Sequence, residues 1–273
     1  MKTNRSISPG RPAFEQGRVS KIHAGQVPFL FRQKALLNVT GHTLRPGGLM
    51  LTSRAMDFCG FGPADRILDA GCGYGMTARY LYDRFGIQAM GADLYLDMLK
   101  IAAAKSGDRI PFTQVRLPSL PLGSGSLDGI FCECVFSLVR EKEQCLQEFL
   151  RCLKQNGKLV LTDLYIPQKF AGMDRNGQNQ GQASSCLEGA LPILDLIRTI
   201  EDAGFKIDII EDHTRLLKQL AGQMIFEHGS LDQFWENTGK RICDKGLTSA
   251  CRAGQLKPGY CMIIAGKYNR AET

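Results

Sequence analysis

Three glycines with an acidic residue before them form the stretch of this chain best suited to bind a ligand. Gly71, Gly73 and Gly75 follow the apolar run 67–68, and a helical pattern begins at Met76. A strand, a glycine turn and a helix together bring bare backbone N–H groups and a helix N-terminus up to a ligand. The acidic residue, Asp69, precedes the first glycine by two positions, where its carboxylate can accept hydrogen bonds from an ammonium group. The pattern therefore favours a ligand that carries positive charge.

The spacing of the glycines separates two classes of nucleotide cofactor. A dinucleotide fingerprint places its third glycine one residue later, where Met76 stands. A second acid, Asp93, ends the short strand expected over 88–93 and lies 20 residues after Gly73. This is close to the offset at which an acid meets the hydroxyl groups of a ribose. The two acids and the G-x-G-x-G spacing favour S-adenosylmethionine over NAD, and the alternative is a glycine-rich turn that binds no ligand.

Around these residues the chain resembles the class I S-adenosylmethionine-dependent methyltransferases. The matching segments are 68–75, 91–94, 97–99 and a second stretch over 120–159. The resemblance implies a methyl transfer to a small molecule, with S-adenosyl-L-methionine as the cofactor. It also implies an α/β, Rossmann-like class I fold: a mostly parallel seven-stranded sheet, helices on both faces and a helical cap insertion. Cofactor contacts are then expected from residues at the ends of neighbouring strands, namely Asp69, Gly71, Gly73, Gly75, Asp93, Leu94, Leu117 and Glu133.

One position departs from the pattern of this family. Many members hold the adenine amino group with an aspartate at the end of the third strand, and Arg116 stands here. Backbone groups around Leu117 are expected to take over that contact.

Two cysteines indicate a class of methyl acceptor. The segments 134–138 and 186–191 resemble the arsenite methyltransferases, in which the cysteine corresponding to Cys186 binds trivalent arsenic. Soft thiolates select soft, polarisable centres. An exposed cysteine near a helix N-terminus has a lowered pKa, which is the prediction for Cys186. Cys134 and Cys186 are therefore candidate acceptor-binding residues, whereas Cys134 could instead be a small buried residue at a strand end.

The remaining cysteines do not complete the arsenic site of that family. Its cysteine before the first strand is absent, because Asp65 and Arg66 stand there. A third thiolate would have to come from Cys243, Cys251 or Cys261. No zinc-type spacing occurs, and no metal site is predicted.

Several functions remain open on these residues. No general base is evident, so the acceptor would already be a strong nucleophile, such as a carbanion, a thiolate or arsenic(III). The resemblance points either to arsenite or to carbon, as in the quinone-ring C-methyltransferases. A second hypothesis is an accessory module that binds the cofactor without catalysis. A third, a nucleic-acid methyltransferase, is disfavoured, because the expected Asn/Asp-Pro-Pro-aromatic tetrapeptide is replaced by residues 134–137.

Alternating strands and helices have to position these residues. Apolar runs predict strands, and helical spacing of apolar residues predicts helices between them and before the first strand. The expected units are a basic arm at 1–26, N-terminal helices at 27–62, a cofactor-binding core at 63–212, a helical cap at 213–257, and a last strand with its tail at 258–273.

Composition limits the other possibilities. The net charge of +7 comes from residues 1–45, which hold eight Lys or Arg and one acid, Glu15. The basic arm could touch nucleic acid, but a solvated tail is the preferred interpretation. Neither an 18-residue apolar run nor a secretory apolar core occurs, so no membrane association is expected. Ten cysteines without a C-x-x-C pair favour a reducing compartment, the cytoplasm. No oligomeric state is predicted.

Overall fold

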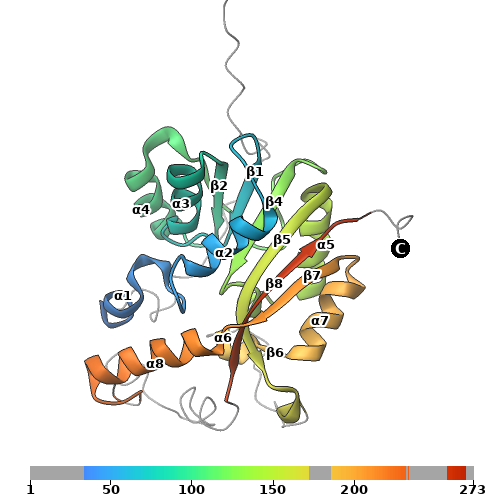
Figure 1. Ribbon diagram of the computed structural model, residues 1–273. Helices are drawn as coiled ribbons and strands as arrows, with labels where there is room; N and C mark the ends of the chain where they lie inside the picture. The colour runs from blue at the N-terminus through green and yellow to red at the C-terminus, as the bar shows by residue number, and fades with distance from the viewer. Residues whose placement is uncertain (1–33, 172–185, 232, 234–256, 269–273) are drawn as a thin grey trace, which may run out of the picture.

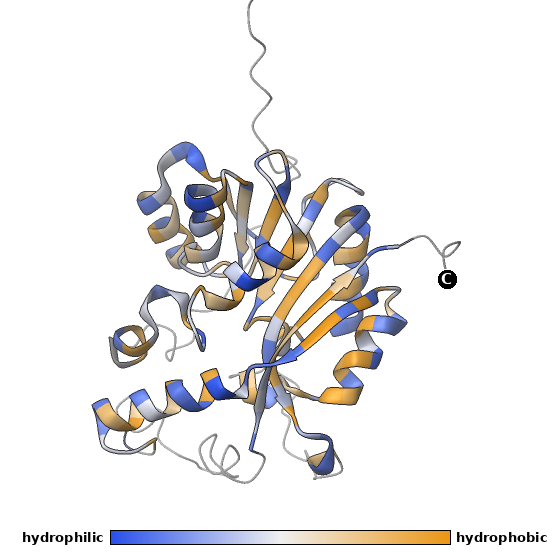
Figure 2. Cartoon of the chain, in the orientation of Figure 1, coloured by the Kyte–Doolittle hydropathy of each residue, from blue (hydrophilic) through white to orange (hydrophobic). Residues whose placement is uncertain are grey.

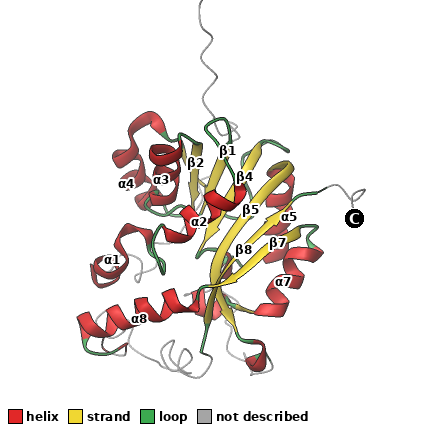
Figure 3. Ribbon diagram, in the orientation of Figure 1, coloured by secondary structure: helices red, strands yellow, loops and turns green. Residues whose placement is uncertain are grey.

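The computed structural model describes residues 34–171, 186–231, 233 and 257–268, and it contains one mixed β-sheet with helices on both faces (Figures 1 and 3). The strands are β1 Arg66–Ala70, β2 Gln88–Asp93, β3 Phe112–Gln114, β4 Leu127–Glu133, β5 Leu153–Ile166, β6 Leu191–Pro192, β7 Lys206–Asp212 and β8 Gly259–Gly266. The helices are α1 Lys34–Thr40, α2 Met50–Cys59, α3 Met76–Phe85, α4 Leu96–Ser106, α5 Lys142–Cys152, α6 Cys186–Gly189, α7 Ile193–Asp202 and α8 Thr214–His228.

The strand order is β3-β2-β1-β4-β5-β8-β7, with β6 paired to β5. Pairs from β3 to β5 are parallel, whereas β8 runs antiparallel to both β5 and β7. The predicted Rossmann-like, mostly parallel sheet is confirmed. The two-residue strand β6 makes the sheet eight-stranded, and it is too short to show any periodicity in the sequence.

Alternation along the strands produces two cores, one on each face of the sheet. In β1, Leu68 and Ala70 point to the face covered by α5 and α7, whereas Ile67 points to the face covered by α2 and α3. Strands buried on both faces are predominantly apolar, and orange is the main colour of the central strands in Figure 2. All eight residues of β8 are buried.

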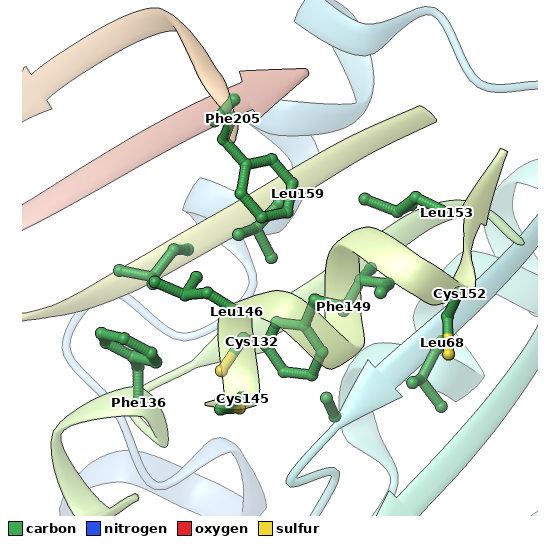
Figure 4. Packing of buried hydrophobic residues seen from close by; sticks show 14 of the residues in the cluster. Leu68, Cys132, Phe136, Cys145, Leu146, Phe149, Cys152, Leu153, Leu159 and Phe205 are labelled. Atoms are coloured by element: carbon green, nitrogen blue, oxygen red, sulfur yellow. The ribbon is translucent and has the colours of Figure 1, made fainter. Parts of the chain in front are cut away.

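Helix α5 anchors the larger core. Its residues Cys145, Phe149 and Cys152 recur at helical spacing and are fully buried against Leu68 and other strand side chains (Figure 4). Burial of each large apolar side chain contributes about 1.5–3 kcal/mol. Burial also raises the pKa of the Cys145 thiol, so this cysteine behaves as a small apolar residue.

Several predicted elements differ at their ends. The apolar run predicts the fifth strand over 158–165, whereas β5 begins at Leu153 and continues through an irregular stretch in which Asn156 has φ +64°. The spacing of apolar residues predicts a helix over 189–203, whereas α7 begins at Ile193, because Pro192 precedes it as the N-cap and ends the helix on that side.

The predicted units lie partly outside the described residues. The arm at 1–26 is outside them altogether. Of the predicted cap at 213–257, the structure describes α8, which contacts α1, and the residues directly after it. The unit boundaries therefore stay predictions. Among the described residues, no helix combines the length and apolar character needed to cross a membrane.

Candidate functional site

A cavity of about 290 Å³ lies at the C-terminal ends of β1, β2 and β4. Parallel strands bring their carboxyl ends to one edge of a sheet, where ligands of this fold class bind. Eight of the ten predicted site residues line this cavity: Asp69, Gly71, Gly73, Asp93, Leu94, Leu117, Glu133 and Cys134. Gly75 and Cys186 are not among the lining residues.

The glycine turn is held against the neighbouring strand. The backbone N–H groups of Gly71 and Cys72 both donate to the carbonyl of Ala92, at 2.7 and 3.0 Å. Gly71 has φ +79°, and a Cβ placed there would lie 2.3 Å from Cγ2 of Val135. The turn thus requires glycine both for its conformation and for its close approach to Val135.

Gly75 has a structural role instead. It precedes α3 as the N-cap with φ +71°, and a Cβ there would lie 2.8 Å from Cζ of Phe112. Its glycine is explained by packing of α3 against the sheet rather than by the cavity.

Asp69 projects a partly satisfied carboxyl group into the cavity. Its Oδ2 accepts a hydrogen bond from the backbone N–H of Ala78 at 3.1 Å, and its Oδ1 has no hydrogen-bond partner among the described residues. Burial raises the pKa of Asp69 to about 8; Glu133 adds to the rise, and Arg45 opposes it. A cationic group at Oδ1 would favour the ionised carboxylate.

Asp93 is the second acid of the cavity, and two backbone donors orient it. Gly73 N–H and Tyr95 N–H each donate to one of its oxygens at 2.8 Å. Burial raises its pKa, against the lowering effect of these donors. Both oxygens keep further lone pairs that can accept the hydroxyl protons of a ribose.

Glu133 belongs to a buried polar network that the sequence did not reveal. Its Oε2 lies 3.0 Å from Nη2 of Arg45, a residue of the turn before α2. The hydroxyls of Thr52 and Thr77 donate to Oε1 and Oε2 of Glu133, at 2.9 and 2.6 Å. The same two hydroxyls accept from Nη2 of Arg45, at 2.8 and 2.9 Å. All four side chains are buried.

Thr77 connects both charges of this network, so its hydroxyl should contribute measurably to stability. We expect Thr77→Val to lower the free energy of unfolding by about 1–3 kcal/mol, because it leaves buried partners unsatisfied. Thr77→Ser keeps the hydroxyl and loses one methyl group, so its cost should be about 0.8 kcal/mol. Urea denaturation of the three proteins measures both values, and equal losses in the two variants would contradict the assignment.

Cys134 lies where β4 leaves the sheet. Its φ is +56°, an unusual value for a residue other than glycine, and its thiol donates to the hydroxyl of Tyr260 at 3.5 Å. Such strained positions are common at functional sites. Burial and the nearby Cys186 thiol raise the pKa of Cys134.

The structure brings Cys186 next to Cys134 and corrects the prediction for its acidity. The Cys186 thiol lies 3.6 Å from the carbonyl oxygen of Cys134. Its pKa is raised to about 12, not lowered, because the thiol is buried and lies near Asp163. The helix α6 that begins at Cys186 has only four residues, which is too short to stabilise a thiolate.

A third thiol does not join this pair within the described residues. The thiol of Cys261 donates to the carbonyl of Asp163 at 3.6 Å. Cys243 and Cys251 lie outside the described residues. No group of three His, Cys, Asp or Glu side chains in the described part of the chain could hold a metal ion.

His42 and Arg116 also line the cavity. The ring of His42 meets that of Tyr74 edge-on at 5.0 Å, and partial burial with the Lys105 charge lowers its pKa. His42 is not among the predicted site residues, because only the fold brings the segment before α2 to the sheet edge.

Comparisons with known proteins agree with this geometry. A family described as "Methyltransferase domain" matches residues 68–161. The chain is 32% identical over 230 residues to an arsenite methyltransferase of Aquipseudomonas alcaligenes, which covers 76% of this chain and 65% of the relative. It is 35% identical over 155 residues to the uncharacterized methyltransferase YodH of Bacillus subtilis, covering 56% of this chain and 65% of that protein. The chain thus spans 65% of the length of each of these two relatives.

Solved structures extend the likeness to the whole fold. The phosphoethanolamine N-methyltransferase 2 of Haemonchus contortus, in complex with S-adenosyl-L-methionine, superposes with a TM-score of 0.68 at 19% identity. The superposition covers 86% of this chain and 56% of that one. At this identity, the likeness establishes the shared architecture.

Proposed function

We propose that the chain belongs to the class I S-adenosylmethionine-dependent methyltransferases and transfers a methyl group from this cofactor to a small-molecule acceptor. One observation carries the proposal. The two strand-end carboxyls, Asp69 and Asp93, and the turn at Gly71 line a single cavity at the sheet edge.

The residues of the cavity fit the chemical groups of the cofactor. The unpaired Oδ1 of Asp69 suits an ammonium group, and Asp93 can accept the protons of the ribose hydroxyls. Backbone around Gly71 leaves room for a ligand where any side chain would meet Val135. Arg116 carries no acceptor atom for an adenine amino group, so the backbone near Leu117 is the proposed contact there.

Catalysis would then depend mainly on orientation. The bound cofactor supplies an electrophilic methyl group on a sulfonium. Apolar side chains of the cavity, such as Met76, Val135 and Leu138, limit the access of water to that group. Holding the acceptor in line with the methyl group converts a bimolecular reaction into an effectively unimolecular one.

Within this function we propose arsenic(III) as the acceptor to test first. The support is the approach of Cys186 to Cys134, together with the arsenite methyltransferase among the relatives. Two thiols suit a soft centre, and binding would have to displace their protons, since both thiols have raised pKa values. A quinone-ring carbon, a non-catalytic accessory role and a nucleic-acid acceptor are the alternatives.

A screen of acceptors, scored by release of S-adenosylhomocysteine, tests the function. The panel should contain arsenite with excess thiol, a quinone precursor, small amines and RNA. Turnover of any small molecule supports the proposal. Cofactor binding without turnover of any acceptor would favour the accessory role, and absence of cofactor binding would refute the assignment altogether.

Cysteine variants test the arsenic site itself. We expect Cys186→Ser and Cys134→Ser each to lower arsenite turnover by about tenfold or more, because a serine oxygen is a hard donor that binds arsenic(III) poorly. Their affinity for S-adenosylmethionine should change little. Cys59→Ser, a partly buried cysteine of α2 that does not line the cavity, is the matched control. Full arsenite turnover in both site variants would exclude the thiol site.

The location of the protein stays a prediction. The ten cysteines of the sequence, which include no C-x-x-C pair, are the ground on which we retain the cytoplasm as a proposal.

A further inference from the structure

Two of the three guanidinium nitrogens of Arg45 are bound by other residues of the protein. Its Nε donates to the carbonyl of Gly48 at 2.9 Å, and its Nη2 donates to two threonine hydroxyls and pairs with Glu133. Its Nη1, which carries two N–H donors, has no partner among the described residues. The side chain is 6% exposed, and Arg45 lines the cavity together with Asp69 and Gly71.

Nη1 of Arg45 is not one of the buried polar atoms left without a partner in the described residues, so water or a ligand can reach it. Burial of a guanidinium is tolerated when every charge is paired and every donor is satisfied. Glu133 supplies the opposite charge, but the fork of an arginine is shaped to hold a second planar anion through its remaining nitrogen. The part of the cavity lined by Arg45 therefore suits a carboxylate.

Asp69 provides the complementary half of the same wall. Its Oδ1 is unpaired, as Nη1 of Arg45 is, and the Arg45 charge is close enough to act on the Asp69 carboxyl. Arg45 and Asp69 both line the cavity, and between them they offer one free pair of donors and one free acceptor. A group that matches both has an ammonium and a carboxylate a few bonds apart, which describes the amino-acid end of S-adenosylmethionine.

We propose that Arg45 binds the carboxylate of the cofactor's methionine part through Nη1, while Asp69 binds its ammonium group. This rests on the cofactor assignment made above. Arg45 is then a residue that determines specificity for an intact amino acid, and Glu133 with Thr52 and Thr77 holds its guanidinium in place. Ligands that lack the carboxylate, such as decarboxylated S-adenosylmethionine, should bind poorly.

Isothermal titration calorimetry with these two ligands tests the assignment. In the wild-type protein, removal of the carboxylate should weaken binding about 10- to 100-fold, the range of a charge-assisted hydrogen bond. In Arg45→Lys, which retains a cation beside Glu133, the ratio of the affinity for S-adenosylmethionine to that for the decarboxylated ligand should fall markedly. Affinity for the decarboxylated ligand should stay close to the wild-type value, which shows that the site remains folded. Arg79→Lys, at a partly exposed arginine of α3 outside the cavity, should leave the ratio unchanged.

A second variant keeps the assignment testable in case Arg45→Lys does not fold. If Arg45→Lys does not fold, the neutral pair Arg45→Gln with Glu133→Gln leaves no unpaired buried charge, and its ratio should fall below about threefold. Two results would overturn the role of Arg45 while leaving cofactor binding intact. One is equal affinity of the wild-type protein for both ligands, and the other is an affinity ratio in the folded variants that equals the wild-type ratio. A wild-type protein that binds neither ligand would instead refute the proposed function.

Discussion

Replacement of Gly71 by alanine is expected to weaken S-adenosylmethionine binding by about 100-fold or more, from an overpacking cost of 1–3 kcal/mol and the strain of a left-handed residue. The new Cβ would lie 2.3 Å from Cγ2 of Val135, which also lines the cavity. Either the turn moves away from Ala92, or Val135 moves into the space meant for the ligand. Calorimetric titration of the cofactor into wild type and variant measures the loss.

A substitution at a second glycine distinguishes the effect of backbone strain from the effect of the clash with Val135. Gly60 ends α2 with φ +66°, and a Cβ there would meet no atom within 4 Å. Gly60→Ala should therefore lower stability by about 1 kcal/mol and leave cofactor affinity unchanged. An affinity of Gly71→Ala close to that of Gly60→Ala would show that the turn does not approach the cofactor.

Cofactor binding should also tighten as the pH rises toward 8, by about tenfold per pH unit, and should weaken again above pH 8 as the ammonium group of the ligand loses its own proton. The cause of the tightening is Asp69, whose pKa of about 8 reflects burial first and the neighbouring Glu133 second. Below pH 8 this carboxyl holds a proton that has to leave before it can pair with an ammonium group. Titrations between pH 6 and 9, in buffers of different ionisation enthalpy, measure both the affinity and the released proton.

Asp69→Asn is the matched variant for this pH dependence. It should bind the cofactor about 10- to 100-fold more weakly than wild type at pH 8.5, through loss of a charge-assisted hydrogen bond. Its affinity should lose the steep dependence below pH 8, although Asp93, whose pKa is also raised, can still contribute. A steep profile that survives in the variant would assign the titration to another group.

The same carboxyl affects the ligand-free protein in the opposite sense. An unfolded aspartate loses its proton near its usual pKa of 3.8, whereas the folded Asp69 keeps it up to about 8. The folded state therefore binds more protons over this interval, and the contribution of Asp69 to stability falls as the pH rises from about 4 to about 8. The pH that favours the cofactor is thus one at which the empty site is least stable.

The sequence was informative where the signals were local. Gly71, Gly73 and Asp69 lie within five residues of one another, and Asp93 follows after a single crossover helix, so spacing alone predicted a shared edge. The parallel sheet followed from the alternation of apolar runs and helices. Eight predicted residues line the cavity for this reason, and their individual roles stay predictions.

The missed features depend on contacts between distant segments. Thr52 and Glu133 are 81 positions apart, and Arg45 and Thr77 are 32 apart, so no spacing rule connects them. The acidity of Cys186 was predicted wrongly because burial outweighs the effect of a four-residue helix, and burial is a property of the folded chain. The positive φ of Cys134 is likewise set by the way β4 leaves the sheet.

The position of β8 has a consequence for how the protein is made. This strand is the last described element of the chain, yet it lies between β5 and β7 and is buried along its whole length. During synthesis, β5 leaves the ribosome about a hundred residues before the strand that covers its edge, at a rate of about 5–20 residues per second. The nascent chain therefore carries an unpaired, apolar sheet edge for several seconds. During this interval the chain is most prone to aggregate and most dependent on a chaperone.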